Sequence, residues 1–402
     1  MSRAVEVPVT PSVLRWAIDE SGYAPEQVAH AAGVNLSELE RWLSGLGKPT
    51  LTSARKMASK LHRPLASFLL PKPPEDRRLA VEFRHPVDNQ RSLSPEERRS
   101  LRRAGRLQEV LSWLARELNV SPGRIPTTST NDDPVQIAAK IRGLIGISVS
   151  RQKGWATWSD AFDEWRTAVE NAGLLVFLVS VGKESVNGFS LWDSEAPLIA
   201  VNTARNEASR VFTLFHELGH LATKTSSACL EAVRTKSRTD PVERWCERFA
   251  AEVLMPTEDV RSSLRAYGWH AGQTITGLAL PERIARTYKV SLRAAVIRLI
   301  EIGVTDWFLY DQIPPVSEAK RPGGGGGGRD RTQIREDQFG ERATSLLITA
   351  VDRDLLNRSQ DARVVTEEVR DYPRKMSLNT AAGLLGIPSV NLMAFLGFEQ
   401  ID

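Results

Sequence analysis

Two histidines and a glutamate between residues 212 and 221 have the spacing of a zinc site. The apolar stretch Phe-Thr-Leu-Phe-His-Glu-Leu-Gly-His-Leu contains the pattern His-Glu-x-x-His. If this stretch is a helix, His216 and His220 lie one turn apart on the same face, where two imidazoles can bind one zinc ion. Glu217, rotated about 100° from His216, can take a proton from a water molecule at that ion. The pattern therefore predicts metal-assisted hydrolysis.

The pattern also has a second interpretation, because two histidines on an apolar helix can be hydrogen-bonded core residues. A third ligand would separate the two interpretations, and the helix predicted next along the chain offers candidates. Asp240 is typical of an N-cap, Pro241 of a first helical residue, and Pro256 ends the run. On this helix Glu243 and Glu247 lie one turn apart beside apolar positions. They are either metal ligands or part of a solvated surface.

Several motifs around these residues resemble, in the same order, those of the ImmA/IrrE family of metallopeptidases. The resemblance covers roughly residues 130–310. The motifs are Asn-Gly-Phe-Ser-Leu-Trp from residue 187, Ala-Pro-Leu-Ile-Ala-Val-Asn ending at residue 202, Arg-Val-Phe-Thr-Leu-Phe-His-Glu-Leu-Gly-His from residue 210, Glu-x-x-Cys-x-x-Phe-Ala-Ala-Glu-Val-Leu-Met-Pro from residue 243, and Ile-Ala-Arg-Thr-Tyr-Lys-Val-Ser-Leu-Arg-Ala-Ala-Val-Ile-Arg-Leu from residue 284.

The resemblance implies a zincin-like, gluzincin-type domain that binds one Zn²⁺ per chain. In this family the third ligand is the Glu of a Glu-x-x-(Ala/Cys)-Asn pattern, and Glu243 matches that Glu. The sequence departs from the pattern at the Asn position, which Glu247 occupies. We expect Glu243 to be the ligand, whereas Glu247 is either an alternative ligand or a residue that orients a histidine.

A small α+β unit should position these residues. Helices are predicted at 134–144 and 161–172, and three short strands at 174–179, 187–192 and 198–201. The resemblance implies that an edge strand lies above the active helix and pairs with an extended peptide substrate. The candidate residues for that edge are Gly188, Phe189, Ser190, Leu191 and Trp192.

A second donor to the developing oxyanion is usual in such sites, and His or Tyr often supplies it. The candidates after the predicted ligand helix are Tyr267, His270 and Tyr288. The sequence does not choose among them, and each is alternatively an ordinary structural residue.

The N-terminal region is predicted to be a bundle of short helices at 13–20, 25–32, 36–44 and 51–61. The turn at 33–35 contains glycine, and residues 26–45 resemble the Xre-type helix-turn-helix family. DNA contacts would come from Ser37, Arg41 and Lys48. Glu38 and Glu40 on the same helix repel phosphates, so docking to a protein is the alternative function.

The expected fold is mostly α with one small α+β unit. The predicted segments are a helix-turn-helix domain at 1–70, a Pro-rich linker and amphipathic helix at 71–130, and the peptidase domain at 131–320. Six consecutive glycines mark a linker at 321–330, which would separate off a small helical domain at 331–402. Within that last domain, residues 377–396 predict two short helices about a Gly-Ile-Pro turn.

Composition narrows the class of protein. The 402 residues include only two cysteines, which disfavours a fold stabilised by several disulfides. The net charge of +4 is compatible with binding to nucleic acid. No apolar stretch approaches the ~18 residues of a membrane span, and no apolar signal region is evident near residue 1. We expect a cytoplasmic protein that does not enter membranes.

The resemblance implies a zinc-dependent endopeptidase that regulates transcription by cleaving an Xre-type repressor in a stress or mobile-element response. A homodimer and DNA binding through the N-terminal domain are further expectations. Two alternatives stay open at this stage. One is a DNA-binding regulator with a structural or sensory zinc ion, and the other is a toxin–antitoxin or phage-defence component that acts by binding.

Overall fold

The computed structural model describes residues 5–74, 93–224, 240–314 and 331–352, and the short strands at 227–229, 356–357 and 376–377. The described chain divides into two compact units. The first contains residues 5–74 and 93–105, and the second contains the described residues from 106 onward. No helix among the described residues is both long and apolar enough to cross a membrane.

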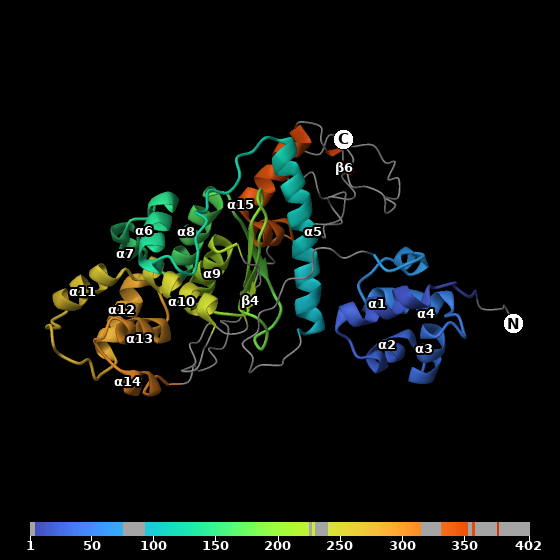
Figure 1. Ribbon diagram of the computed structural model, residues 1–402, viewed down its shortest axis with the longest axis horizontal. Coiled ribbons are helices and arrows are strands. Elements are labelled where there is room, and N and C mark those ends of the chain that lie inside the picture. Colours follow the sequence, from blue (N-terminus) through green and yellow to red (C-terminus); the bar gives the residue numbers. More distant parts are fainter. Residues whose placement is uncertain are drawn as a thin grey trace. The chain divides into compact units, whose positions relative to one another are not determined.

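The first unit is the predicted helical bundle. It contains α1 (Pro11–Ser21), α2 (Pro25–Ala32), α3 (Leu36–Leu43), α4 (Leu51–Lys60) and the 3₁₀ helix η1 (Leu65–Leu69) (Figure 1). Gly33, at φ 80°, ends α2, and the Asn35 side chain caps α3 by accepting the Glu38 N–H at 2.9 Å. The bundle closes around buried side chains that include Leu14, Val28, Leu39, Trp42, Met57 and Phe68. The four helices are confirmed, whereas a role of α2 and α3 in DNA binding stays a prediction.

The predicted amphipathic helix is α5 (Pro95–Glu117), and it begins with a capping box formed by Ser94 and Glu97. The Ser94 N–H donates to Glu97 Oε2 at 2.6 Å, and the Glu97 N–H donates to Ser94 Oγ at 3.3 Å. Residues 95–105 of this helix belong to the first unit and residues 106–117 to the second. In the second unit the buried Gln108 side chain donates to the carbonyls of Leu191 and Ala196. The segment predicted as a separate linker therefore contributes to both units.

A four-stranded sheet lies in the second unit. Its strands are β1 (Leu175–Val179), β2 (Gly188–Leu191), β3 (Leu198–Asn202) and β4 (Ser227–Cys229), in the order β1-β3-β2-β4. β1 and β3 are parallel, and β2 is antiparallel to both β3 and β4. The three predicted strands are confirmed, and β4 was not predicted.

The addition of β4 corrects the prediction that β2 is the free edge. Gly188, Phe189 and Ser190 pair in register with Cys229, Ala228 and Ser227. A three-residue strand in a polar stretch has no detectable alternation of apolar and polar residues, so the sequence pattern could not indicate it. Trp192 lies just beyond β2 and is 42% exposed.

Helices cover the sheet and form the main core. They are α6 (Pro134–Ile145), α7 (Val149–Gly154), α8 (Trp158–Asn171), α9 (Glu207–Ala222) and α10 (Pro241–Leu254). Figure 1 shows α8, α9 and α10 gathered on one side of the strands, and α9 packs against β2 and β3. The fully buried Trp165 makes edge-to-face contacts with Trp155 and Phe215. Trp165 and Trp155 thus serve core packing, whereas Trp158 is 36% exposed.

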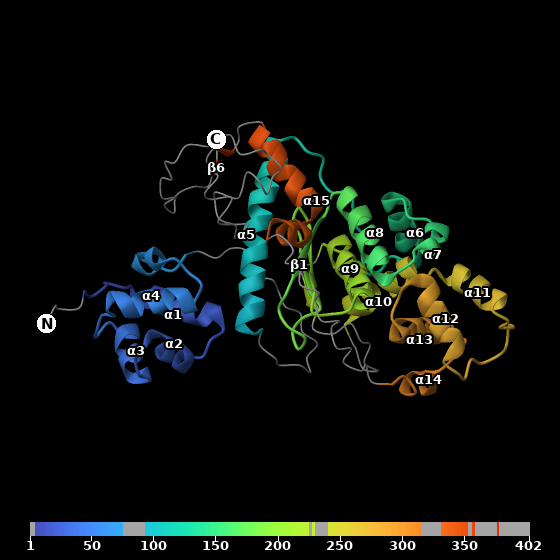
Figure 2. The ribbon, with the colours of Figure 1, turned by 180° about the vertical axis from the view of Figure 1, so that it is seen from behind.

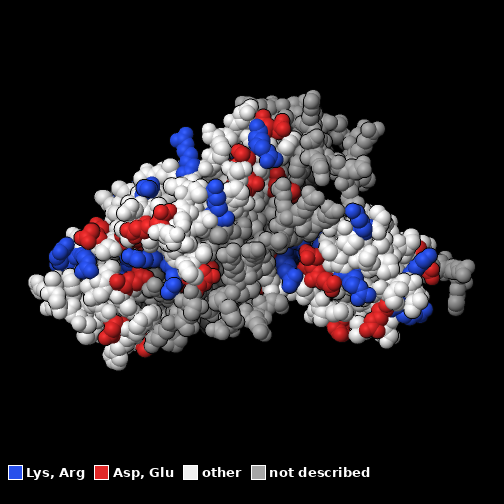
Figure 3. Space-filling view, viewed as in Figure 1, with Lys and Arg blue, Asp and Glu red and all other residues white. Residues whose placement is uncertain are grey.

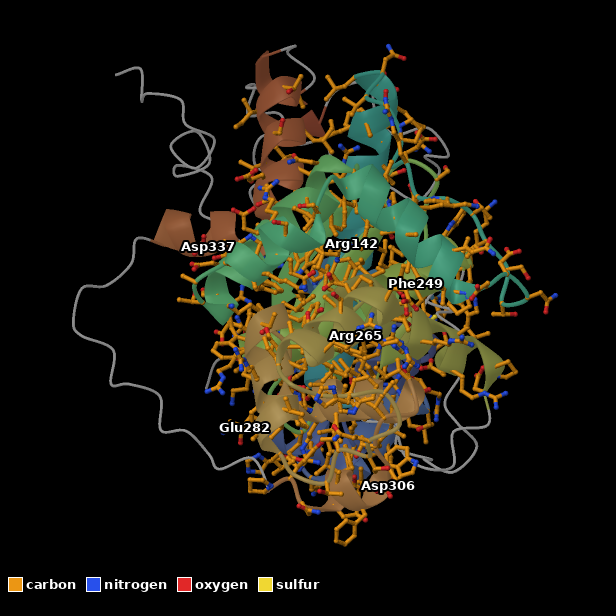
Figure 4. All side chains as sticks on the ribbon, turned by 90° about the vertical axis from the view of Figure 1, so that its left-hand side faces the viewer. Arg142, Phe249, Arg265, Glu282, Asp306 and Asp337 are labelled. Atoms are coloured by element: carbon orange, nitrogen blue, oxygen red, sulfur yellow. The ribbon has the colours of Figure 1, made fainter. Side chains whose placement is uncertain are left out.

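The end of α10 is held by buried polar side chains. Arg142 donates to the carbonyl of Val253 at 2.6 Å, and Gln152 donates to that of Leu254 at 2.9 Å. Arg298 donates to the carbonyl of Met255 at 2.9 Å. Figure 4 shows Arg142 and Phe249 among the side chains of this interior. These bonds satisfy carbonyls that the helix itself leaves without partners, and they fix the position of α10.

Four further helices contribute buried residues to the same core. They are α11 (Thr257–Ala266), α12 (Ala279–Tyr288), α13 (Leu292–Glu301) and α14 (Trp307–Asp311). Ala295, Val296 and Leu299 on α13 are fully buried, so this helix contributes to the core.

Helix α15 (Arg331–Asp352) follows the glycine-rich stretch and belongs to the second unit. Figure 2 shows it beside β1, where Phe339 packs edge-to-face on Phe177 with ring centroids 5.5 Å apart. The helix bends at Gly340, and the Glu341 N–H then donates to the Glu170 carboxylate at 3.0 Å. Burial raises the pKa of Glu170 to about 7 even though Arg166 opposes the shift.

The predicted boundary at residue 331 therefore separates segments that share one compact unit. Beyond α15 the structure describes two short paired strands, β5 (Leu356–Asn357) and β6 (Met376–Ser377). The rest of the predicted C-terminal domain, including the helix pair after residue 377, lies outside the described residues.

Candidate metal centre

Two closely packed helices, α9 and α10, carry the candidate ligands. The Asn206 side chain caps α9 by accepting the Ser209 N–H at 2.9 Å, and Asp240 caps α10 by accepting the Val242 N–H at 2.8 Å. A methyl group added at Gly219 would lie 3.1 Å from Cys246 Sγ. The glycine in the middle of α9 therefore allows α10 to approach closely, and the cost of glycine in a helix is offset by this packing.

This packing brings three potential ligand atoms together. His216 Nε2 and His220 Nε2 are 3.2 Å apart. Glu243 places Oε2 at 3.3 Å from His216 Nε2 and Oε1 at 3.3 Å from His220 Nε2. Among the described residues, these three form the group of side chains with metal-ligand chemistry.

The spacing of these atoms fits a zinc ion. Zinc binds nitrogen and oxygen at about 2.0–2.1 Å in tetrahedral geometry, which places two ligand atoms about 3.3–3.4 Å apart. The three observed separations, 3.2, 3.3 and 3.3 Å, agree with this value. Two imidazoles and a carboxylate are also a donor set that zinc accepts in catalytic sites. The residues present therefore fit the ion.

The site is buried, and its charges depend on each other. His216, His220 and Glu243 are 2%, 3% and 8% exposed. Burial disfavours the charged carboxylate, but hydrogen bonds from both histidines outweigh it and hold the pKa of Glu243 well below its usual range. Burial lowers the pKa of His220, whereas Cys246 and Glu243 raise it, with a net rise to about 10. A metal ion would take the place of the shared protons, because ligands bind it in their deprotonated forms.

Glu217 lies beside this group and beneath β2. It follows His216 on α9 and is fully buried. A methyl group added at Gly188 on β2 would lie 3.6 Å from Glu217 Cγ. The first residue of β2 thus passes close over the side chain that the sequence pattern marks as a general base.

Residues 169–299 match the family model of the IrrE N-terminal-like domain, Peptidase_M78. The matched segment includes all four strands and the helices α9 to α12, so it contains His216, Glu217, His220 and Glu243. The match supports the ImmA/IrrE resemblance and a metallopeptidase function for this segment. No curated protein matches the chain.

Within the Peptidase_M78 segment, the structure separates the two candidate glutamates. Glu243 contacts both histidines, whereas Glu247 is one turn farther along α10 and is not among the three clustered ligand residues. Glu247 is 5% exposed and lines a pocket together with Phe212. The assignment of Glu243 as the third ligand stays a prediction that this geometry favours.

Two of the three candidate oxyanion donors, Tyr267 and Tyr288, have hydroxyl groups that bond to other residues of the matched segment. The Tyr288 hydroxyl bonds to Asp259 and, at 3.0 Å, to Ser263, and burial together with Asp259 raises its pKa. The Tyr267 hydroxyl lies 2.8 Å from Thr287 Oγ1. His270 is exposed, and its backbone N–H donates to Gln273. No contact described for these residues brings them to His216 or Glu243.

Two residues of the segment that the sequence reasoning did not single out touch the histidines. The Phe212 ring stacks on the His216 ring with centroids 6.4 Å apart, and the nearby Cys246 raises the pKa of His220. Each lies one helical turn from a candidate ligand, Phe212 before His216 and Cys246 after Glu243. This spacing is visible in the sequence, but the spacing alone does not determine which of several neighbouring side chains contacts a histidine.

The candidate DNA-contacting residues lie in the first unit, outside the Peptidase_M78 match. Ser37, Arg41 and Lys48 are exposed. Arg41 pairs with Glu38 at 3.2 Å, so part of its charge is neutralised within α3. Figure 3 shows both signs of charge interspersed over the visible face of α1–α4. A uniformly basic surface, which phosphate binding favours, is not seen on this face.

Replacing Gly188 with alanine should destabilise the second unit. The added methyl group would lie 2.5 Å from Thr213 Cγ2 and 2.6 Å from the backbone oxygen of Ala200. Because a backbone oxygen cannot turn away, β2 or β3 must shift, at a cost of about 1–3 kcal/mol in the free energy of unfolding. Urea denaturation followed by tryptophan fluorescence measures this change.

The matched control is Gly143→Ala on α6, where an added methyl group meets no atom within 4 Å. Alanine there should stabilise the helix by up to about 1 kcal/mol. If both variants unfold at the same urea concentration, β2 can move away from α9 at no cost in the free energy of unfolding.

Proposed function

We propose that the second unit is a zinc-dependent endopeptidase. The observation that supports it best is the triangle of His216, His220 and Glu243 with the buried Glu217 beside it. Catalytic zinc sites have three protein ligands and keep one position open, whereas structural sites usually have four. Within the described parts of the chain, three such residues gather, which favours catalysis over a structural or sensory ion.

Glu217 is the proposed general base. A zinc ion at this site would supply Lewis-acid chemistry, polarising the substrate carbonyl and lowering the pKa of water. The Glu217 carboxylate takes the proton from the attacking water and then delivers it to the leaving amine. His216, His220 and Glu243 would hold the ion, and their burial limits the access of bulk water to them.

The proposed substrate is a polypeptide, and its binding mode must account for β4. An extended peptide can pair with Gly188–Ser190 only if β4 leaves, because β4 already pairs with these residues. Leu191 and Trp192 lie beyond the pairing with β4, and Trp192 is partly exposed. We propose that the peptide crosses α9 near these residues.

We further propose that the natural substrate is an Xre-type repressor and that its cleavage switches on genes of a stress or mobile-element response in the cytoplasm. The helical first unit supports this proposal, because a module of the repressor's own kind could pair with the repressor or bind near its operator. A homodimer through this unit is part of the same proposal.

The test compares protein N-termini across the proteome in cells that carry the wild type or Glu217→Gln. We expect a new N-terminus inside a helix-turn-helix repressor, present with the wild type and absent with the variant. Identical N-termini after induction by DNA damage and by zinc stress would contradict the proposal and favour a function by binding. A phenotype that survives Glu217→Gln would favour the same conclusion.

A further inference from the structure

The second half of α5 holds the loop that joins β2 to β3 (Figure 1). The side-chain amide of Gln108, which is 8% exposed, donates to the carbonyl of Leu191 at 2.7 Å and to that of Ala196 at 3.0 Å. Leu191 ends β2, and Ala196 lies two residues before β3. Both partners are acceptors, and the two hydrogens of the amide can serve both. Gln108 therefore joins the two ends of the loop 192–195.

A second contact from the same helix orders the middle of this loop. Ser112, one turn after Gln108 on α5, donates from its hydroxyl to Asp193 Oδ1 at 2.8 Å. The same oxygen accepts the backbone N–H groups of Glu195 at 2.9 Å and of Ala196 at 2.8 Å. The conformation of the loop is thus fixed by α5 together with the hydrogen bonds of Asp193.

Trp192, the first residue of the loop, lies near the end of α9 that carries His220. The Lys224 ammonium, four residues after His220, is 5.7 Å from the centre of the Trp192 ring. At the other end of β2, Gly188 passes over Glu217 in the middle of α9. The strand and Trp192 therefore follow α9 from the proposed general base past the turn of His220. The partly exposed indole offers a large, rigid contact surface to a peptide that crosses α9 there.

We propose that Gln108 is a positioning residue of the peptidase, which holds the loop 192–195 so that Trp192 contacts the bound peptide. This role rests on the proposed peptidase function and on the proposed path of the peptide near Leu191 and Trp192. Gln108 lies outside residues 169–299, so the support for this part of the site comes from outside the segment matched by the family model. Its hydrogen bonds go to loop carbonyls rather than to Glu217 or a metal ligand. Their loss should therefore weaken substrate binding and leave the chemical step unchanged.

Replacing Gln108 with methionine should raise KM and leave kcat unchanged. Methionine is similar in length and volume, but it donates no hydrogen bond to Leu191 or Ala196. The zinc-loaded full-length protein is assayed on a synthetic peptide that the wild type cleaves, and we expect KM to rise at least about fivefold. A variant that only folds less completely would instead show a lower apparent kcat at the same KM, because its folded fraction binds the peptide normally.

A double-mutant cycle tests whether Gln108 acts through Trp192. Trp192→Ala should raise KM by a similar factor. Adding Gln108→Met to Trp192→Ala should then raise KM by less than about twofold, because the ring that Gln108 positions is already absent. Two effects that multiply in the double variant would contradict this role, since Gln108 would then act independently of Trp192.

The matched control is Gln136→Met, the same substitution at an exposed residue of α6. It should keep the wild-type KM and kcat. If Gln108→Met fails to fold, Ser112→Ala provides a second variant, because it removes the hydroxyl that donates to Asp193 and should raise KM in the same way.

The outcomes separate this role from the proposed function. An unchanged KM in folded Gln108→Met and Ser112→Ala, or a loss of kcat alone, would overturn the positioning role and leave the peptidase intact. Absence of cleavage by zinc-loaded wild type would overturn both.

Discussion

Replacing Glu217 with glutamine should lower peptidase activity at least about 100-fold while zinc remains bound. Glutamine keeps the size of the side chain in its fully buried position beside His216, but it cannot accept the proton of the attacking water. The activity is measured on the peptides that the wild type cleaves, and the zinc content by elemental analysis of the purified protein.

Glu207→Gln is the matched control. This residue lies in the first turn of the same helix, and its carboxylate is 3.7 Å from the Arg210 guanidinium in a pair that solvent partly reaches. Exposed pairs contribute little to stability, so the control should keep its activity. Full activity in Glu217→Gln would exclude Glu217 as the base. Lost activity together with lost zinc would instead indicate a disturbed site.

Removal of the third ligand should have the largest effect on zinc affinity. Glu243→Ala takes away the carboxylate that contacts both histidines, and we expect zinc affinity to fall more than about 100-fold. Glu247→Ala, one turn farther along the same helix, should lower it less than Glu243→Ala does. A chromophoric chelator that competes for zinc measures both values.

Thermal unfolding gives an independent readout. Zinc in 100-fold excess over its dissociation constant stabilises the native state by about 2.7 kcal/mol. Wild type and Glu247→Ala should therefore show a higher melting temperature with zinc, and Glu243→Ala should not. The reverse order of the two variants would make Glu247 the ligand and Glu243 a supporting residue.

Local features of this chain were readable from the sequence because they depend on neighbours within a helix or strand. The spacing of His216 and His220 places them on one face of any helix that includes both. Caps at Asn35, Asp240 and Ser94 were also predictable, since a capping side chain bonds to a residue two or three positions away.

Helix spacing alone could not choose between Glu243 and Glu247, because both lie on the same face of α10, and the expectation of Glu243 rested on the family resemblance. The choice depends on how far α10 slides along α9, and the contact of Gly219 with Cys246 sets that position. The same limit applied to the oxyanion candidates Tyr267 and Tyr288, because the partners of their hydroxyl groups lie on another helix.

Tertiary structure alone decided the order of the strands and the place of α15. The pairing of β4 with β2 joins residues about 40 positions apart, and a three-residue strand has too few side chains to show a period. The six glycines predicted a domain boundary, yet α15 packs on β1 through Phe339 and Phe177. A glycine-rich stretch of sequence is compatible with many positions of the helix that follows it. The position of α15 is decided by burial of its apolar surface against the sheet, which only the folded chain provides.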